Sequence, residues 1–573
     1  MAKQPKIGVY ICHCGINIAN TVDVEAVRDF AQNLPGVSVA RDYTYMCSDP
    51  GQGLIIEDIG EFGLDKVVVS ACSPRMHEMT FRAAIQGAGL NPYCLEIANI
   101  REQCSWVHPD KEDGTVKARS LVASAVAKAA LLEPLEAREV GVIEGALVVG
   151  GGVAGVHAAL DIADAGFPVF VVEQSDHLGG HALELSRTYP RMEYAADLFE
   201  PVLRRLTNHP RATILLNSRL KDVTGYVGNF EATVETRAGD STGERKIRLG
   251  AIIIATGFAP FDAHLKPEFG YGQYPQVITA LEFERLVSAD GPTGGRILVN
   301  GNEPRDVVFI KCVGSRDRTV GNPYCSRVCC MVTAKQAHLV QQELPEASVT
   351  VLYMDVRAHG KGFEEYYDLV RETGVYYRRG NPAEILQQGE RVVVRVEDTF
   401  LGEFVDVQAD LVVLATGLVP RRETAEVAQL LKLSQSADGF LLEAHPKLRP
   451  VDTASDGIFL AGCAQGPKDL SDTIAQAKAA AVSAMIPFAR GKVMVESATC
   501  TVDEELCAGC GMCEEVCPYG ALRLDERHGV MRANVVLCKG CGTCAAICPS
   551  NAITLMHFTP RQVMAQVDAL MML

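Results

Sequence analysis

Eight cysteines in the last fifth of the 573-residue chain fall into two runs of identical spacing, C-x2-C-x2-C-x3-C, and each run is closed by a proline. The first run comprises Cys507, Cys510, Cys513 and Cys517, and the second comprises Cys538, Cys541, Cys544 and Cys548. This spacing predicts two 4Fe–4S clusters, in which the fourth cysteine of each run ligates the other cluster. Cysteine quartets also bind zinc, but two complete runs favour iron–sulfur clusters that transfer single electrons.

A third group of four cysteines follows an apolar strand expected at residues 306–310. Its members, Cys312, Cys325, Cys329 and Cys330, have the spacing C-x12-C-x3-C-C. At the end of a strand, four such thiolates can close around one further 4Fe–4S cluster. A zinc site and a vicinal dithiol at Cys329 and Cys330 are the alternatives, and the two-cluster tail of the same chain favours the iron–sulfur interpretation.

Five more cysteines are expected at strand ends within the first 133 residues. Apolar strands are expected near residues 6–11, 37–40, 66–70 and 93–97, and the carboxyl ends of parallel strands meet at one edge of a sheet. The cysteines concerned are Cys12, Cys14, Cys47, Cys72 and Cys104. One cluster needs four ligands, so a fourth cluster is predicted here, and the sequence leaves open which four cysteines ligate it. Cys94 lies inside an expected strand and is interpreted as a core residue.

Residues 146–172 have the pattern of one βαβ unit that binds a dinucleotide. A strand at 146–149 leads into a glycine-rich turn, a helix is expected at 156–165, and a strand at 169–172 ends before Glu173. Gly150 makes the turn, Gly152 lets the backbone approach a pyrophosphate, and Gly155 lets helix and strand pack closely. The pyrophosphate is expected at the helix N-terminus, and Glu173 is expected to accept hydrogen bonds from the ribose hydroxyls.

Later segments favour FAD over NAD and resemble the thioredoxin-reductase family across residues 146–486. Two glycines follow Glu173, two apolar strands each end in Ala-Thr-Gly, and a glycine-bounded strand at 457–462 precedes a helix of small residues. The cofactor-binding residues predicted from these segments are Gly179, Gly180, Thr256, Gly257, Thr416, Gly417 and Gly462. That family usually has an aspartate where this chain has Cys463, which we interpret as a buried, inert thiol.

The second nucleotide site of that family is predicted to be lost. The strand at 306–310 leads into Lys311-Cys312-Val313-Gly314 rather than G-x-G-x-x-G, so a cluster would lie where NADPH binds in the family. Lys468, after the flavin-closing segment, is the one catalytic candidate, because a positive charge near the ring would favour the anionic reduced flavin. A solvated loop lysine is the alternative, and the more common situation for lysine.

Composition and charge place these motifs in an acidic α/β protein. The chain is 48% hydrophobic with 51 glycines, and its formal charge of −17 argues against binding nucleic acid or an anionic membrane surface. We find no stretch of membrane-spanning character and no secretory signal at Met1. Twenty cysteines, mostly at ligand spacing, indicate metal rather than disulfides, and a reducing, cytoplasmic compartment.

The expected architecture is α/β: a two-dinucleotide-binding flavoprotein core between an N-terminal α/β domain and a C-terminal two-cluster ferredoxin domain. The predicted boundaries are 1–133 for the N-terminal domain, 145–290 and 406–490 for the two parts of the FAD-binding domain, 291–405 for a pseudo-NADPH domain, and 495–573 for the ferredoxin domain. Apolar spacing at 561–573 predicts a final helix, and packing on its own ferredoxin domain is favoured over docking to a partner.

Together these motifs resemble the A subunits of the heterodisulfide reductases of methanogens and their bacterial relatives. The resemblance covers nearly the whole chain and includes YICHCG at 10–15, YMCS at 45–48, ACSPR at 71–75, NIREQCSWVH at 99–108, KCVGSRD at 311–317 and YCSRVCC at 324–330. It implies a cytoplasmic oxidoreductase component with FAD and 4Fe–4S clusters, forming a homodimeric core and working with other subunits in methanogenesis or a related metabolism.

In that family, partner subunits reduce a disulfide and supply electrons from a hydrogenase, a formate dehydrogenase or another donor. The flavin splits electron pairs, sending one electron to a low-potential ferredoxin and the other towards the disulfide. The longest members carry an additional ferredoxin module in the flavin core, whereas residues 225–295 here contain no cysteine, so that this electron exit is expected to be missing or supplied by a partner. A stand-alone NAD(P)H oxidoreductase and a component of a quinone-linked respiratory complex are the alternative functions.

Overall fold

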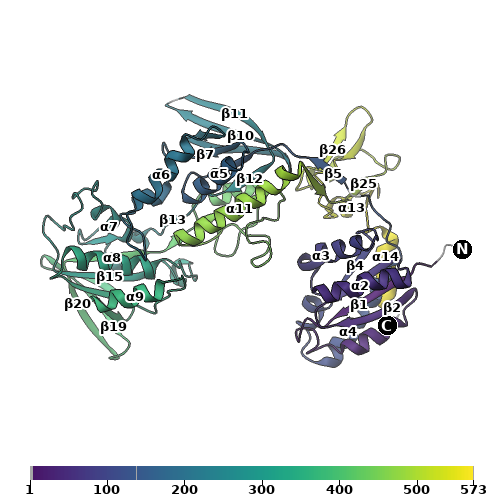
Figure 1. The fold of residues 1–573 in the computed structure, drawn as a ribbon, viewed down its shortest axis with the longest axis horizontal. Coiled ribbons are helices and arrows are strands. Elements are labelled where there is room, and N and C mark those ends of the chain that lie inside the picture. Colours follow the sequence, from purple (N-terminus) through teal and green to yellow (C-terminus); the bar gives the residue numbers. More distant parts are fainter. Residues whose placement is uncertain (1–3, 137, 240, 572–573) are drawn as a thin grey trace. The chain divides into compact units, whose positions relative to one another are not determined.

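The computed structural model describes residues 4–136, 138–239 and 241–571, and the chain divides into two compact units. One unit comprises Met1–Glu139 together with Met494–Leu573, and the other comprises Val140–Val493. Figure 1 follows the chain from the N-terminal α/β domain through the long central segment to the C-terminal strands. Among the described residues, none of the helices combines the length and the apolar character that a membrane crossing requires.

The N-terminal α/β domain is built on a four-stranded parallel sheet with the strand order β2-β1-β3-β4. Its strands are β1 (Ile7–Cys12), β2 (Val37–Tyr43), β3 (Lys66–Ala71) and β4 (Leu95–Asn99). Its helices are α1 (Val24–Gln32), α2 (Asp49–Phe62), α3 (Pro74–Gly87) and α4 (Lys111–Ala129). Every residue of β1 and β3 is buried, as expected for the central strands of a parallel sheet that is covered on both faces. All four strands end at one edge.

The C-terminal segment of the same unit forms two antiparallel strand pairs that repeat one plan. β25 (Cys500–Val502) pairs with β28 (Ile553–Leu555), and β26 (Leu522–Asp525) pairs with β27 (Val530–Ala533). Each half also contains a helix of about one turn, α12 (Met512–Glu515) or α13 (Thr543–Ile547). In each cysteine run, the first two cysteines lie in the loop before the short helix, the third lies in the helix and the fourth follows it.

The last helix, α14 (Pro560–Met571), forms where apolar spacing predicts it, although residues 572 and 573 lie outside the described part of the chain. It packs against α4, and the Gln562 side chain donates a hydrogen bond to the carbonyl oxygen of Leu131 (2.9 Å). This corrects the expectation that the helix packs on the ferredoxin domain, because apolar spacing defines a face but not the surface it meets. Much of that face stays open, since Val563, Met564 and Val567 are 41–55% exposed.

The second unit contains a five-stranded parallel sheet with the order β23-β12-β6-β7-β8. These strands are β6 (Ala146–Val149), β7 (Val169–Val172), β8 (Ala212–Leu215), β12 (Ala251–Ile254) and, from a later stretch of chain, β23 (Ile458–Leu460). Helices α5 (Val153–Asp164) and α11 (Leu470–Arg490) pack together on one face through small side chains. The other face packs against the antiparallel strands β9 (Ser218–Tyr226), β10 (Asn229–Ala238) and β11 (Ser241–Leu249).

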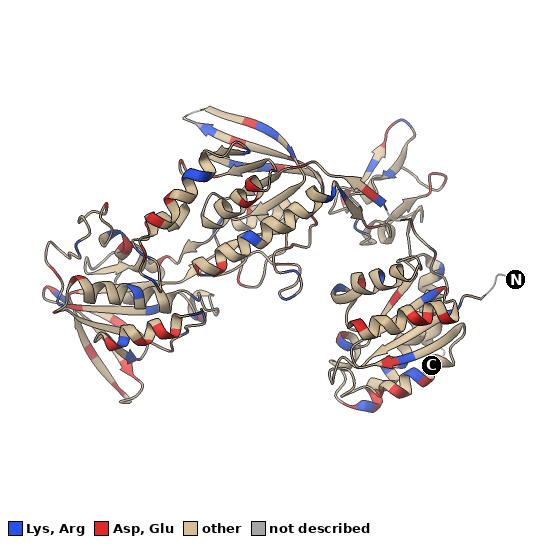
Figure 2. Cartoon of the chain, viewed as in Figure 1, with Lys and Arg blue, Asp and Glu red and all other residues tan. Residues whose placement is uncertain are grey.

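A second five-stranded parallel sheet in the same unit has the order β14-β21-β15-β16-β17. Its strands are β14 (Val277–Thr279), β15 (Asp306–Val313), β16 (Ser348–Tyr353), β17 (Tyr376–Arg379) and β21 (Leu411–Thr416). One face packs on α8 (Cys329–Glu343) and α9 (Phe363–Glu372), and the other packs on β18 (Pro382–Gln388), β19 (Arg391–Asp398) and β20 (Glu403–Ala409). Acidic and basic side chains mix along the outer antiparallel strands, as in the pairs Lys246–Glu231 and Arg395–Asp406 (Figure 2).

One ion pair lies inside this second unit, between α7 (Ala280–Leu286) and α8. The Lys335 and Glu284 side chains are 2% and 1% exposed and lie 2.6 Å apart. Glu284 also accepts hydrogen bonds from the Ser186 hydroxyl (2.9 Å) and the Gln336 amide (2.6 Å). The Lys335 ammonium also donates to the Arg187 carbonyl oxygen (2.8 Å), but among the described residues Glu284 is the one opposite charge paired with it, so removing either charge leaves the other unpaired in a low-dielectric interior.

Replacing Lys335 with methionine is therefore expected to destabilise the fold by about 3–5 kcal/mol, because it leaves the buried Glu284 carboxylate without a paired positive charge. The measurement is the urea-unfolding midpoint of the full chain, followed by circular dichroism. Lys246→Met, which removes one partner of an exposed pair with Glu231, is the control and should leave the midpoint unchanged. Equal losses in the two variants would contradict this interpretation.

Candidate cofactor-binding sites

The glycine-rich turn between β6 and α5 is held by close backbone contacts that exclude side chains. Gly150 has a φ of 111°, and a Cβ at this position would lie 2.3 Å from the carbonyl oxygen of Ala255. A Cβ at Gly155 would lie 1.8 Å from the carbonyl oxygen of Gly150. The turn, the first turn of α5 and the end of β12 therefore pack backbone against backbone.

Gly152, in contrast, faces open space at the start of α5. A Cβ built there meets no protein atom within 4 Å, and no side chain caps the helix. An uncapped helix N-terminus with open space before it binds anions well, because its free N–H groups and the helix dipole both favour negative charge. These residues fit the pyrophosphate of a dinucleotide such as FAD.

The Glu173 carboxylate lies beside this turn, at the end of β7. One of its oxygens accepts the Gly151 N–H (2.6 Å), and the other accepts the Ser175 N–H (2.8 Å) and hydroxyl (2.9 Å). The Gly179–Gly180 segment packs against the same turn. The Gly179 N–H donates to the Gly151 carbonyl oxygen (2.8 Å), and a Cβ at Gly180 would lie 3.3 Å from the Gly152 Cα. The carboxylate is thus fixed at the position that contacts ribose hydroxyls in dinucleotide-binding units.

Residues from two further segments meet the same turn. Thr256 follows β12, and its hydroxyl is buried without a hydrogen-bond partner among the described residues, which leaves one donor and its acceptor pairs for a bound group. Gly257 follows it with a φ of 75°. Gly462, which follows β23, packs against α5, where a Cβ would lie 2.7 Å from the Ala154 methyl carbon. Segments far apart in the sequence therefore converge on one helix N-terminus.

Cys463 and Lys468 lie between Gly462 and α11. The Cys463 sulfur is buried 3.5 Å from the carbonyl oxygen of Lys468, and burial raises the pKa of this thiol, as expected for an inert cysteine. The Lys468 ammonium donates to the Gln465 side-chain oxygen (2.5 Å) and to the Gly466 carbonyl (3.0 Å), and burial lowers its pKa. Lys468 is thus half-buried and held by its own loop, and its catalytic role stays a prediction.

The structure brings Cys312, Cys325, Cys329 and Cys330 together at the carboxyl end of β15. Cys312 lies next to the last residue of that strand with a φ of 62°, and Cys329 and Cys330 begin α8. The Cys329 thiol is fully buried, and its pKa is raised first by burial and then by its three neighbouring thiols. A thiolate at this position needs strong compensation, which a cluster and its surrounding donors would supply.

Nitrogen donors surround these sulfurs. The Lys311 ammonium lies 3.3 Å from the Cys330 sulfur, and the Arg357 N–H donates to the same sulfur at 3.4 Å. The Arg327 N–H donates to the Cys325 sulfur at 3.3 Å. Ligand sulfurs of a cluster carry negative charge, and such donors stabilise it. The donor set therefore fits an iron–sulfur cluster.

In the second five-stranded sheet, the loop between β15 and α8 carries these cysteines and takes the position of a dinucleotide-binding turn. β15 leads to α8 as a strand leads to a helix in a dinucleotide-binding unit, but the helix begins with two cysteines. Thr416 and Gly417 lie beside this loop at the end of β21, where a Cβ on Gly417 would lie 3.0 Å from the Gly314 carbonyl oxygen. The next strand, β22 (Leu418–Val419), pairs with β13 (Ala259–Pro260), just after Gly257.

Two side chains connect the cysteine group at 312–330 to the N-terminus of α11. The Arg327 guanidinium forms an ion pair with Asp472 in the first turn of α11 (2.7 Å), while its own N–H contacts the Cys325 sulfur. Tyr189 is half-buried, and the pKa of its hydroxyl is raised above all by desolvation and then by the neighbouring Asp469, Cys329 and Cys463 side chains. A short path through protein thus connects this cysteine group to the segment that closes the flavin-type site.

In the N-terminal α/β domain, four of the five candidate cysteines gather at the carboxyl edge of the sheet. The Cys14 N–H donates to the Cys12 sulfur (3.3 Å), and the Arg101 guanidinium donates to the Cys14 sulfur (3.3 Å). Cys47 also lies close to Cys12. Burial raises the pKa of Cys72 to about 12, with Arg101, Cys14 and Cys12 nearby.

Cys104 is the candidate that the structure separates from this group. It is fully buried, its sulfur lies 3.1 Å from the carbonyl oxygen of Gly114 in α4, and burial raises its pKa to about 11. It therefore contacts α4 rather than the other four thiols. His13 binds Asp42 (2.7 Å), as a polar loop residue would.

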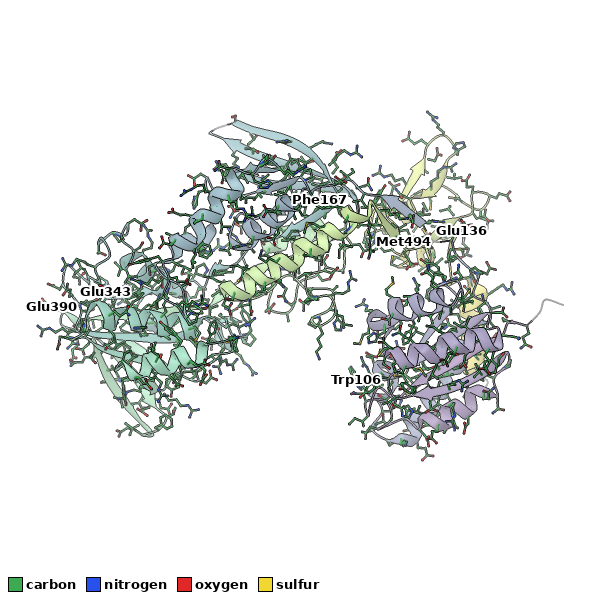
Figure 3. All side chains as sticks on the ribbon, viewed as in Figure 1. Trp106, Glu136, Phe167, Glu343, Glu390 and Met494 are labelled. Atoms are coloured by element: carbon green, nitrogen blue, oxygen red, sulfur yellow. The ribbon has the colours of Figure 1, made fainter. Side chains whose placement is uncertain are left out.

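Arg101, which contacts Cys14, also connects this group to the surface. Its guanidinium lies over the ring of Trp106, 4.8 Å from the centroid, and Trp106 is 59% exposed (Figure 3). Cys14 and Cys47 are themselves only half-buried, so the cysteine group lies close to the surface of the domain. Such proximity to the surface suits electron exchange with another protein.

In the ferredoxin domain, each of two cavities is lined by three cysteines of one run and the fourth of the other. One cavity is lined by Cys507, Cys510, Cys513 and Cys548, and the other by Cys517, Cys538, Cys541 and Cys544. Backbone N–H groups of Met531 and Ala521 donate to the sulfurs of Cys507 and Cys517, both at 3.3 Å. The grouping has the crossover arrangement of a two-cluster ferredoxin.

In the part of the chain that the structure describes, no three His, Cys, Asp or Glu side chains are placed to hold a single metal ion.

Sequence reasoning missed three neighbours of the ligand sulfurs: Lys311, Arg101 and Cys500. Lys311 adjoins Cys312 in the sequence but contacts Cys330, and Arg101 contacts Cys14 across 87 residues. Cys500 lies outside both C-x2-C runs and lines the second ferredoxin cavity. In the sequence, these three residues stand out only because they lie within or just before cysteine-rich segments. Their contacts with the sulfurs depend on the fold.

Fold and sites together define a flavin- and iron–sulfur-containing oxidoreductase, and comparisons with known proteins agree. Residues 145–484 match the family described as pyridine nucleotide-disulphide oxidoreductase, and residues 506–553 match the 4Fe-4S dicluster domain. The solved thioredoxin reductase of T. acidophilum aligns with 60% of this chain and 98% of its own, at 16% identity and a TM-score of 0.41. The predicted fold class, an α/β two-dinucleotide-binding core with a ferredoxin domain, is confirmed by the two family matches.

Full-length relatives are more specific. The A subunit of the H(2):CoB-CoM heterodisulfide,ferredoxin reductase of Methanothermobacter marburgensis is 45% identical over 99% of this chain and 97% of its own. The iron-sulfur A subunit of the CoB--CoM heterodisulfide reductase of Methanocaldococcus jannaschii is 43% identical over 93% of each chain. This chain belongs to the A-subunit family of heterodisulfide reductases, as its motifs predict. The first alignment runs over 644 residues, so that relative carries segments that this chain lacks.

Gly152→Ala provides a test of the flavin site. We expect the variant to fold normally and to retain at least tenfold less FAD, because a Cβ at Gly152 meets no protein atom but enters the space before α5. The flavin absorbance per chain measures the loss, and circular dichroism checks the fold. Gly60→Ala, also without a neighbour within 4 Å but in α2, is the matched control. Full flavin content in Gly152→Ala would place the pyrophosphate elsewhere.

Proposed function

We propose that this chain is the electron-transfer flavoprotein of a heterodisulfide-reductase-like complex. It passes electrons between a donor partner, FAD and a disulfide-reducing partner through four 4Fe–4S clusters. The observation that carries the proposal is the cysteine group at 312–330, which stands where a second dinucleotide would bind and is joined to α11 by the Arg327–Asp472 ion pair. Bound FAD supplies the exchange of electron pairs for single electrons.

The proposed ligand sets follow the four cysteine groups. Two clusters lie in the ferredoxin domain, one held by Cys507, Cys510, Cys513 and Cys548, the other by Cys517, Cys538, Cys541 and Cys544. A third is held by Cys312, Cys325, Cys329 and Cys330. A fourth is held by Cys12, Cys14, Cys47 and Cys72, and Cys104 is a core residue that binds Gly114.

The protein's own groups position the flavin and set the charge around it. The N–H groups at the start of α5 hold the pyrophosphate, Glu173 and the Gly179–Gly180 turn hold the adenosine ribose, and the free Thr256 hydroxyl contacts the cofactor. Lys468 places a positive charge in the loop before α11. Arg327 fixes the cysteine loop against the same helix, which keeps the separation between flavin and cluster constant.

The names of the relatives supply the partner classes. One relative is the A subunit of the H(2)/formate:CoB-CoM heterodisulfide,ferredoxin reductase of Methanococcus maripaludis, 41% identical over 92% of this chain. By analogy, the donor partner here is a hydrogenase or formate dehydrogenase, and the acceptors are a disulfide-reducing partner and, through an electron exit that a partner supplies, ferredoxin. Bifurcation balances when one electron of each pair goes to ferredoxin and the other towards the disulfide, so that two pairs reduce one disulfide. We place this complex, with a homodimeric core, in the cytoplasm.

The rival function is a stand-alone NAD(P)H oxidoreductase. It requires a second open glycine turn, and the cysteine loop occupies the equivalent position between β15 and α8. Anaerobic addition of NADPH to the purified chain separates the two functions. We expect flavin absorbance to persist in the presence of NADPH and to bleach when the donor partner is added together with its own reductant, hydrogen or formate. Rapid bleaching by NADPH alone would support the rival function.

The iron content of cysteine variants tests the fourth ligand set. The anaerobically purified chain is expected to hold about sixteen irons, and Cys14→Ser about twelve, because each cluster carries four. Cys104→Ser is the matched control and should retain all the iron, since the Cys104 sulfur contacts the Gly114 carbonyl oxygen instead of the other thiols. Iron loss in Cys104→Ser with retention in Cys14→Ser would overturn this ligand assignment.

Purification from the native host tests the assignment to a complex. Anaerobic capture of the tagged chain should recover a hydrogenase- or dehydrogenase-type donor and a disulfide-reductase partner in fixed stoichiometry. Recovery of the chain alone, with NADPH-dependent activity, would contradict the proposal.

A further inference from the structure

The ferredoxin domain contains a ninth cysteine, which belongs to neither C-x2-C run. Cys500 begins β25, is 1% exposed, and lines the cavity of Cys517, Cys538, Cys541 and Cys544. Its backbone N–H donates to the Cys538 sulfur at 3.4 Å, and its own sulfur lies 3.7 Å from the Cys538 sulfur. The second cavity therefore holds five sulfurs where a cluster needs four ligands.

The internal repeat of the domain shows what is unusual about Cys500. Cys500 stands seven residues before Cys507, and Met531 stands seven residues before Cys538. The two positions exchange roles across the repeat, because the Met531 N–H donates to the Cys507 sulfur at 3.3 Å and the Cys500 N–H donates to the Cys538 sulfur. Met531 is also 1% exposed and lines the first cavity.

The two cavities thus have matching backbone donors, and each has one hydroxyl beside a ligand sulfur, Thr543 beside Cys541 (3.5 Å) in the second and Ser550 beside Cys548 (3.6 Å) in the first. Several equivalent side chains differ between the cavities, and the pair Cys500 and Met531 differs in the capacity to donate a proton to sulfur. A methionine thioether has no proton to donate, whereas a cysteine that ligates no metal keeps its S–H. Once Cys538 binds iron it is a thiolate and can only accept a hydrogen bond. At 3.7 Å, the Cys500 thiol is within reach to donate to it. Hydrogen bonds to ligand sulfurs tune cluster potentials, because they stabilise the extra negative charge of the reduced cluster.

We propose that the Cys500 thiol donates a hydrogen bond to the Cys538 ligand sulfur and thereby makes the cluster of the second cavity easier to reduce than its twin. The inference rests on the proposed presence of both ferredoxin clusters. The extra donor gives the two clusters an order, with the electron residing preferentially at the Cys500 end of the domain. Cys500 acts through Cys538 and is a positioning residue rather than a ligand.

Cys500→Met, which copies the residue of the first cavity, is the principal test. In the anaerobic full chain, a redox titration monitored by electron paramagnetic resonance should show one ferredoxin cluster shifted to a lower midpoint. A tenfold change in its reduction equilibrium is a shift of about 59 mV for a one-electron couple. The iron content should be unchanged, and the midpoints of the other clusters should stay in place. Cys500→Ser, which keeps a donor, should leave the midpoint close to that of the wild-type chain.

Met531→Cys is the reciprocal variant, and it tests the inference even if substitutions at position 500 prevent folding. It places a thiol beside Cys507 and should raise the midpoint of the other ferredoxin cluster. An unshifted midpoint in Cys500→Met with full iron content would overturn the inference, and so would loss of about four irons, which would make Cys500 a ligand. Absence of ferredoxin-type iron from the wild-type chain would instead overturn the proposed function itself.

Discussion

A cysteine sulfur that binds iron carries negative charge, and holding it away from water requires donors that compensate that charge. In this chain the backbone supplies many of them. The N–H groups of Cys14, Arg327 and Met531 donate to the sulfurs of Cys12, Cys325 and Cys507, each at 3.3 Å. Two of these donors, Cys14 and Arg327, have positive φ angles of 51° and 61°, so the loops bend back towards their own cysteines. The remaining features of the sites depend on this arrangement of fixed donors around sulfur.

The two parallel sheets of the central unit show how one structural plan serves two cofactors. In the first sheet, the strand-to-helix turn leaves the N-terminus of α5 open in front of Gly152, where a pyrophosphate fits. In the second sheet, α8 begins with Cys329 and Cys330, and a helix N-terminus stabilises a thiolate for the same electrostatic reason that it stabilises a phosphate. In the proposed function, cysteines in place of glycines at this turn hold a cluster where a nucleotide would otherwise bind.

Much of this was predictable from the sequence where the pattern is local. β6 and β7 begin and end at the predicted residues, because their buried apolar runs are bounded by glycine, proline or a glutamate. The cysteine quartets at 312–330 and in the ferredoxin domain come from spacing alone. The exclusion of Cys104 could not be predicted, since it depends on the turn at Arg101–Ser105 that directs the thiol towards α4. Spacing in the sequence likewise does not encode tertiary contacts. These include the contact of Lys311 with Cys330, the packing of α14 on α4 and the proposed role of Cys500.

The central claim is that one polypeptide joins a two-electron flavin to four one-electron centres. A stoichiometric reductive titration of the anaerobic full chain, counted in electrons per chain, measures this most directly. The account predicts about six electrons, two for FAD and one for each of four clusters. Uptake of only two electrons, with the visible change confined to the flavin bands, would contradict it.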